Sequence, residues 1–353
     1  MKKIFKLAIV AVFAVTLVFS AVGCSRKHAH KWGDWERTET SHTRKCKVKN
    51  CGEIQSGNHK DSVCDECAEF RAIGFGFADC IGLQGVDDAH ADFALEANEW
   101  FTERGKELGF IYYAVDTYKS GWDDLTEAKL REYDLVVLLN DKPGTVTART
   151  AFREYMDKGG ACMAFHAAGF AMWNTPDTPP TEWDGWFSNT LLRCGVYGNR
   201  PRGEEDGGGF YWNTWNPTSE PMTVETSEHF ATANLDCDEF ISAPCEWYEW
   251  YNDLYEDKDT TVLISMNPTP ENPAGDDKRP GMEHQVWRGG RHPIAWANNN
   301  YNMIYMNFGH NLRNYNNGDE GKQSKTFSSE KQNQFTLDAM FGLVEAGADK
   351  IKW

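Results

Sequence analysis

A histidine that follows a short apolar segment near the middle of the chain is the strongest candidate for chemistry. Gly159 and Gly160 end a charged helical segment, residues 161–165 are apolar, and His166 then lies among small residues. In an open α/β sheet, a strand delivers such a side chain to the carboxyl edge, where ligands bind. Hydrolases place a Ser or Cys nucleophile at this strand-to-helix turn. His166 is therefore expected to exchange protons or bind a metal, and the alternative is a buried, hydrogen-bonded histidine.

Other titratable groups could act with His166. His310 ends the last predicted strand and could reach the same edge, whereas a loop histidine is the alternative; His229 follows Glu228 and could cap a turn or join the site. Cys162 lies within the strand, four residues before the turn, and is interpreted as a core cysteine. Because the turn itself carries no cysteine, the sequence disfavours the amidotransferase reaction.

Two glutamates in an aromatic segment are candidate acids or bases. Glu246 and Glu249 are three residues apart among Trp247, Tyr248 and Trp250. Aromatic walls can raise the pKa of a carboxyl group and so suit it to general acid or base catalysis. If this segment is a strand, the two carboxylates point to opposite faces and only one can serve the site. The histidines and a carboxylate would also suit a divalent metal, although their spacing contains no ligand motif such as H-E-x-x-H.

The start of the chain has the pattern of an export signal. Lys2, Lys3 and Lys6 precede an uncharged apolar run, and Cys24 follows small residues. This pattern predicts a signal peptide over residues 1–24 and resembles a bacterial lipoprotein signal, in which Cys24 is lipidated. The alternative is a plain secretory signal. We therefore expect an extracytoplasmic protein whose contact with the membrane is a lipid anchor.

A small module over residues 25–69 interleaves histidines with cysteines. Its pairs are Cys46-x4-Cys51 and Cys64-x2-Cys67, a spacing typical of two knuckles around one structural Zn²⁺ ion. A segment this short buries too little apolar surface to fold alone, so a metal or disulfides must hold it. We expect these four cysteines to bind zinc, with His42 or His59 able to replace one. Disulfides are the alternative that an exported context permits. The module resembles cysteine/histidine ribbon repeats of bacterial surface proteins, which implies a structural or adhesive role.

Residues 70–353 alternate apolar runs with amphipathic stretches. Four strands and three helices in alternation predict a doubly wound, mostly parallel sheet with right-handed crossovers. The expected strands cover residues 72–78, 110–115, 134–140, 161–165, 222–225, 261–266, 293–297 and 303–308. The expected helices cover residues 90–108, 125–131, 145–157 and 329–345, and residues 175–216 and 267–290 are expected to be long loops.

Several segments together resemble the trehalose-utilisation (ThuA-like) family. They are residues 130–138, the strand that ends at His166, and residues 228–232, 246–249, 293–296 and 307–310, in the family's order. Two segments depart from it: residues 298–302 replace a G-K-G-R turn, and residues 229–232 replace an H-P-I-T-like motif. The resemblance implies a flavodoxin-like fold of the class I glutamine-amidotransferase type. It also implies carbohydrate metabolism, with sugars or 3-keto-glycosides as substrates.

The composition limits the kinds of partner that the protein is expected to bind. A net charge of −17 excludes a phosphate-backbone partner, so we expect no nucleic acid. Among 14 tryptophans, Trp173 and Trp247 adjoin the candidate site and, with Tyr248, could stack on a sugar ring; packing loops onto the sheet is the alternative. The sequence leaves three hypotheses: an enzyme of carbohydrate catabolism centred on His166, a non-catalytic carbohydrate-binding surface protein, or an adhesion protein that uses the cysteine module.

Overall fold

The structure is a computed structural model of the chain. It describes residues 29–38, 40–59, 64–78, 90–118, 121–123, 125–170, 181–195, 214, 216–250, 253–275, 286–312 and 324–348. The chain divides into two compact units, Met1–Ser62 and Val63–Trp353. The predicted signal segment and Cys24 lie outside the described residues. Within the described ranges, no helix is both long enough and apolar enough to cross a membrane.

The first unit is built on a small antiparallel sheet. Its strands are β1 (Glu36–Arg37), β2 (Ser41–Lys45) and β3 (Ile54–Asn58), in that order. The ring of Trp35 lies edge-on to His42 at 4.4 Å between ring centroids, and the guanidinium of Arg44 lies 4.2 Å above the same indole. A few aromatic and cation–π contacts thus take the place of the apolar core that so short a segment cannot form.

The second unit contains a nine-stranded sheet in the order β5-β4-β6-β7-β12-β11-β10-β8-β9. The first five strands are parallel and the last four are antiparallel. The parallel strands are β4 (Arg71–Gly76), β5 (Ile111–Asp116), β6 (Leu135–Leu138), β7 (Ala161–Phe165) and β12 (Met303–Met306). The antiparallel strands are β8 (Pro221–Val224), β9 (Glu239–Ile241), β10 (Thr260–Met266) and β11 (His292–Asn298). The parallel strands follow the order 2-1-3-4-5, which confirms the flavodoxin-like fold.

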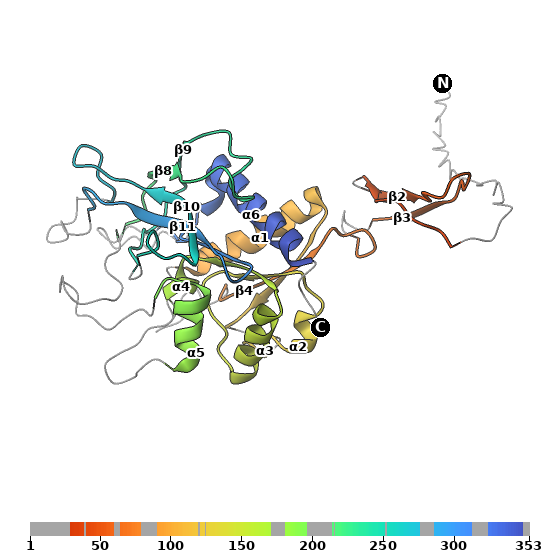
Figure 1. Cartoon of the computed structure of the whole chain (residues 1–353), viewed down its shortest axis with the longest axis horizontal. Helices are drawn as coiled ribbons and strands as arrows, with labels where there is room; N and C mark the ends of the chain where they lie inside the picture. The colour runs from red at the N-terminus through yellow and green to blue at the C-terminus, as the bar shows by residue number, and fades with distance from the viewer. Residues whose placement is uncertain are drawn as a thin grey trace, which may run out of the picture. The chain divides into compact units, whose positions relative to one another are not determined.

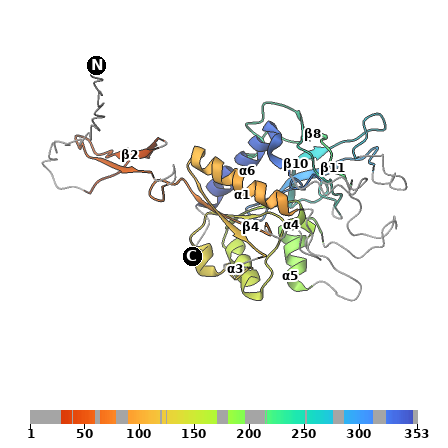
Figure 2. The ribbon, with the colours of Figure 1, turned by 180° about the vertical axis from the view of Figure 1, so that it is seen from behind.

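Helices cover both faces of this sheet. One face carries α1 (Ala91–Leu108) and α6 (Glu330–Ala348), and the other carries α3 (Val146–Asp157), as Figures 1 and 2 show. The side chains of strand β7 explain why both faces are covered. Met163 and Phe165 belong to the apolar cluster shared with α1 and α6, whereas Cys162 and Ala164 belong to the cluster shared with α3. Because successive side chains of a strand point to opposite faces, a continuously apolar strand must be covered twice.

Shorter helices complete the second unit. They are α2 (Glu127–Leu130), α4 (Ala167–Phe170), α5 (Glu182–Gly185), a π-helical turn over Trp186–Leu191 and a 3-10 turn over Thr326–Ser328. The sequence analysis expected one long loop over residues 175–216, which is wrong for Glu182–Leu191. Trp183 and Trp186 pack there against the ring of Phe152. These two rings therefore anchor the helical segment against α3.

The connection from α3 to β7 fixes the position of the strand. Gly159 has φ 94° and follows the last helical turn; its N–H donates to the carbonyl of Met156, and the N–H of Gly160 donates to that of Tyr155. This pair of bonds is the Schellman motif, which requires a left-handed residue such as glycine. The Tyr155 hydroxyl also donates to the carbonyl of Ala161 and accepts from its N–H, which fixes the start of β7.

A substitution at Gly160 tests the packing of Tyr155 against the α3–β7 connection. A β-carbon at Gly160 would meet the ring of Tyr155 at 2.4 Å, and hydrogen bonds hold that ring in place. We expect Gly160→Ala to lower the free energy of unfolding by about 1–3 kcal/mol in a urea titration. Gly185→Ala is the matched control, because nothing lies within 4 Å of the added carbon; it should be neutral or stabilising by up to about 1 kcal/mol. Equal effects of the two substitutions would contradict the proposed packing.

Candidate functional site

His166 occupies a strained turn at the carboxyl end of β7. Its φ of 32° is in the left-handed region, which a non-glycine residue adopts rarely. The hydroxyl of Tyr305 and the N–H of Gly169 both donate to its carbonyl, and its own N–H donates to Met306. The predicted strand-to-helix turn is therefore present. Its side chain, however, is 0% exposed, so the expectation of an exposed ring is wrong and the buried, hydrogen-bonded alternative describes the imidazole.

Three further side chains meet His166 from distant parts of the sequence. His90 precedes α1, Glu246 follows β9, and His310 follows β12. The ring centroid of His166 lies 5.0 Å from that of His90 and 5.4 Å from that of His310, and Nε2 of His310 lies 3.4 Å from Oε2 of Glu246. We call His90, His166, Glu246 and His310 the quartet. One nitrogen or oxygen atom from each member lies within 4.8 Å of the others, so the quartet could hold a metal ion.

Hydrogen bonds set the tautomers of two quartet rings. Nδ1 of His166 lies 2.7 Å from Oδ1 of Asn307, an acceptor, so Nδ1 carries the proton. Nδ1 of His310 lies 2.6 Å from the carbonyl of Asn311 and is protonated for the same reason. Each ring therefore keeps a lone pair on Nε2, and Nε2 of His310 lies beside the Glu246 carboxylate. Nε2 of His166 is buried and has no hydrogen-bond partner among the described residues.

Burial and neighbouring imidazoles determine the charge of His166. Desolvation, followed by repulsion from His90 and His310, holds the pKa of His166 well below its ordinary value. The ring is therefore neutral at pH 7 and offers a lone pair rather than a proton. Tyr248 stacks on it with 4.2 Å between ring centroids, and the tyrosine hydroxyl lies 3.5 Å from Nε2 of His90. Tyr248 thus contacts two members of the quartet, and its role in binding a substrate stays a prediction.

Other predicted residues lie elsewhere. Glu249 contacts His292, with 3.5 Å between its Oε1 and Nδ1 of the ring, and does not join the quartet. Trp247 is fully buried, packs against Phe308 and donates from Nε1 to the carbonyl of Thr218, so it is a core residue and does not form a sugar-stacking surface. Trp173 lies outside the described residues.

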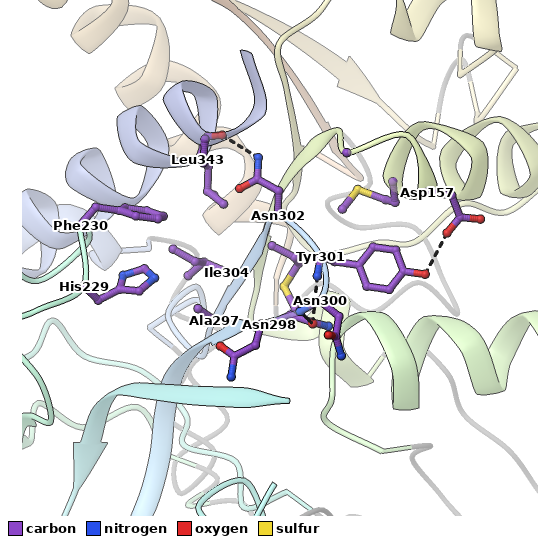
Figure 3. A pocket seen from close by; sticks show the side chains of 15 residues that line it. Asp157, His229, Phe230, Ala297, Asn298, Asn300, Tyr301, Asn302, Ile304 and Leu343 are labelled. Carbon is purple, nitrogen blue, oxygen red and sulfur yellow. Dashed lines mark hydrogen bonds between the residues drawn. The ribbon is translucent and has the colours of Figure 1, made fainter. Parts of the chain in front are cut away.

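His229 lines a cavity at the opposite edge of the sheet (Figure 3). The cavity has a volume of about 460 Å³ and also borders Gly159, which precedes β7, and Asn302, which precedes β12. Both residues mark the amino ends of parallel strands, whereas His166 and His310 follow the carboxyl ends. Nδ1 of His229 accepts from the N–H of Ala231, and burial lowers its pKa. The structure therefore separates His229 from the quartet.

Comparison with known proteins identifies the family. The family model described as ThuA, trehalose utilisation, matches residues 84–323, which include every member of the quartet. The chain belongs to the trehalose-utilisation (ThuA) family. A ThuA-like protein from Bacteroides uniformis is 30% identical with a TM-score of 0.57, covering 78% of this chain and 91% of that one. A ThuA-like protein from Parabacteroides merdae is 15% identical with a TM-score of 0.50, covering 80% and 92%. No curated protein matches the sequence.

Sequence reasoning missed two residues of this ThuA site. His90 was taken as the start of a helix, although a helix that follows the first parallel strand begins at the same edge as His166. Asn307 was included in a family segment without a role, yet its side chain orients the His166 ring. The position directly after a parallel strand was the available signal for both, because such positions converge in an α/β sheet.

The cysteine module of this ThuA protein differs from the predicted single site. Cys46 and Cys51 group with His30, and Sγ of Cys51 lies 3.5 Å from Nδ1 of that ring. His30 was not among the predicted ligands. Cys64 and Cys67 belong to the second unit, where the N–H of Cys67 donates to the carbonyl of Cys64. Two thiols and one imidazole are a ligand set that suits Zn²⁺, so metal binding in the first unit remains a prediction with a revised set of ligands.

Thiol reactivity separates this site from that of an amidotransferase. Cys162 is fully buried, and burial raises its pKa; burial likewise raises the pKa of Cys194 to about 12 from 9.0. We expect both thiols to react with iodoacetamide at pH 8 roughly 1000-fold more slowly than an exposed thiol. Cys237, which is half-buried, provides the internal comparison in site-resolved mass spectrometry. Rapid alkylation of Cys162 in the folded protein would contradict its assignment to the core.

Proposed function

We propose that this protein is an enzyme of carbohydrate utilisation that acts at the quartet on a sugar or a 3-keto-glycoside. Membership of the ThuA family supports the substrate class. The proposal includes export and lipid anchoring at Cys24, for which the support is the predicted signal over residues 1–24. The observation that carries the enzymatic part is the convergence of three imidazoles and one carboxylate from four separate segments.

The position of the quartet suits a reaction centre. Its members follow or precede elements at the carboxyl edge of the parallel strands, where open α/β sheets bind ligands. An enzyme hypothesis requires His166, His310 and one glutamate at a common point, because a reacting atom must reach all of them. Glu246 lies 3.4 Å from His310, whereas Glu249 contacts His292. That arrangement favours catalysis over the binding-only and adhesion hypotheses.

The quartet can move a proton without a charged His166. Nδ1 of His310 donates to Asn311, so a proton between its Nε2 and the Glu246 carboxylate would be shared by the two groups. His166 belongs to the same cluster, and its Nε2 carries a lone pair. A buried carboxylate–imidazole pair of this kind can accept a proton from a carbon next to a sugar keto group, or return it to a leaving oxygen. Tyr248 forms one wall of the centre, where its ring stacks on that of His166.

Glu246 and Glu249 form a matched pair of tests. In a screen of glycosides and 3-keto-glycosides with the full chain, wild type is expected to release sugar from at least one compound. Glu246→Gln should lower kcat/KM for that compound by about 10²- to 10⁴-fold, because it removes the carboxylate from the centre. Glu249→Gln should leave it within about threefold, since its carboxylate pairs with His292 away from the quartet.

Two results would overturn the proposal. One is turnover that Glu246→Gln leaves unchanged in a folded variant. The other is saturable sugar binding by wild type, measured by calorimetry, with no product from any compound in the screen. The second result would select the binding-only hypothesis, because the fold would then have kept a carbohydrate site without its chemistry.

A further inference from the structure

The quartet has the composition of a transition-metal site. Imidazole nitrogen and carboxylate oxygen together suit divalent first-row metals such as Mn²⁺, Fe²⁺, Co²⁺ and Zn²⁺, whereas Mg²⁺ and Ca²⁺ prefer oxygen ligands alone. Three imidazoles and one carboxylate give the quartet four ligand atoms, all within 4.8 Å of one another. His90, His166 and His310 are each at most 2% exposed and Glu246 is 5% exposed, so bulk water does not fill the space between them.

The spacing of the quartet fits one ion. Ligand atoms about 2.0–2.1 Å from a tetrahedral Zn²⁺ lie roughly 3.3–3.4 Å from one another. The separation of Nε2 of His310 and Oε2 of Glu246 is 3.4 Å. The other separations are at most 4.8 Å. A separation of 3.4 Å between an imidazole nitrogen and a carboxylate oxygen is that expected of two ligands of one cation.

The hydrogen-bonded shell presents lone pairs to the centre. Asn307 accepts from Nδ1 of His166, and the Asn311 carbonyl accepts from Nδ1 of His310. Metal-binding histidines characteristically donate their other ring N–H to a carboxamide, carboxylate or carbonyl, which orients the ring and increases its basicity. The consequence is visible at His166, whose buried Nε2 has no hydrogen-bond partner among the described residues. Burial of a polar atom without a hydrogen-bond partner raises the free energy of the folded protein unless a ligand binds to that atom.

We propose that the quartet binds one divalent transition-metal ion. This inference goes beyond the proposed function, because it does not depend on which sugar the protein processes. An ion with five or six coordination positions would keep one or two of them open after binding the quartet. There it could polarise a sugar carbonyl and lower the pKa of a bound water, which would then take over proton transfer from the ligating side chains.

Metal binding can be measured without any substrate. The full chain, stripped with a chelator, is titrated with Co²⁺ and Zn²⁺, and the bound metal is counted by mass spectrometry after gel filtration. The first unit could take up metal through Cys46 and Cys51, so the count is compared between variants. Wild type should bind one equivalent more than Glu246→Gln or His166→Gln. The extra Co²⁺ should show visible d–d bands without sulphur-to-cobalt charge transfer.

His292 and Glu249 provide the matched control. They form a histidine–glutamate contact of 3.5 Å in the same unit but outside the quartet. His292→Gln and Glu249→Gln should keep the full metal count. Asn307→Ala should retain the site but weaken its affinity about 10- to 100-fold, because the His166 ring loses its orienting partner.

Stability gives a second readout. Excess Zn²⁺ at 100 times its dissociation constant stabilises a native protein by about 2.7 kcal/mol, so it should raise the Tm of wild type and of the control variants more than that of Glu246→Gln. An equal metal count and an equal Tm shift in wild type and in folded Glu246→Gln would overturn the inference. If that variant fails to fold, the same comparison with His90→Gln decides the question. Metal binding without sugar turnover would leave this inference standing while the proposed function fails.

Discussion

The hydrogen bond between Nδ1 of His166 and Oδ1 of Asn307 holds the centre of this molecule in one chemical state. It is buried and 2.7 Å long, and it joins residues that follow two adjacent parallel strands, β7 and β12. By fixing the proton on Nδ1, it leaves a lone pair on the buried Nε2. Without it, the His166 ring could adopt the other tautomer or turn away, and the quartet would no longer present lone pairs to one point. The left-handed backbone of His166 and the Tyr305 bond to its carbonyl serve the same end.

Parallel-sheet topology explains how residues 90 and 310 come to lie together. Each strand of the 2-1-3-4-5 core ends at one edge, and the loops that follow must start there. Strand β7 is covered by helices on both faces, and its start is fixed by Tyr155, so the position of His166 depends on the packing of the whole core. The quartet is consequently a product of the fold rather than of a local motif, which is why no short sequence pattern marks it.

The strands and helices of the sheet could be predicted well from the sequence, because their apolar residues follow a regular period. The apolar run of β7 and the glycine pair before it determine both the strand and its direction. The same reasoning proposed His166 and His310, which follow predicted strands, and Glu246, which lies at the start of an aromatic segment. It could not distinguish Glu246 from Glu249, because that choice depends on an irregular segment whose side chains follow no period. The sequence also could not separate the roles of two aromatic residues. Tyr248 stacks on His166, whereas Trp247 lies in the core.

The structure also changes the chemistry that the sequence suggested. An exposed histidine at a turn would be a general acid or base by itself. A buried neutral ring, paired with Asn307 and facing two more imidazoles and a carboxylate, is better suited to ligation or to a shared proton. The replacement of a nucleophilic cysteine by histidine at the turn therefore accompanies a different kind of centre within the same fold, and the buried Cys162 takes no part in it.

Anomalous diffraction tests the central claim most directly. Crystals of the full chain grown with Zn²⁺ would be measured on both sides of the zinc absorption edge. The account predicts a difference peak within about 2.0–2.2 Å of Nε2 of His166 and of a Glu246 carboxylate oxygen, with His90 and His310 completing the site. Zinc peaks confined to other parts of the molecule, with the quartet empty at saturating Zn²⁺, would contradict it.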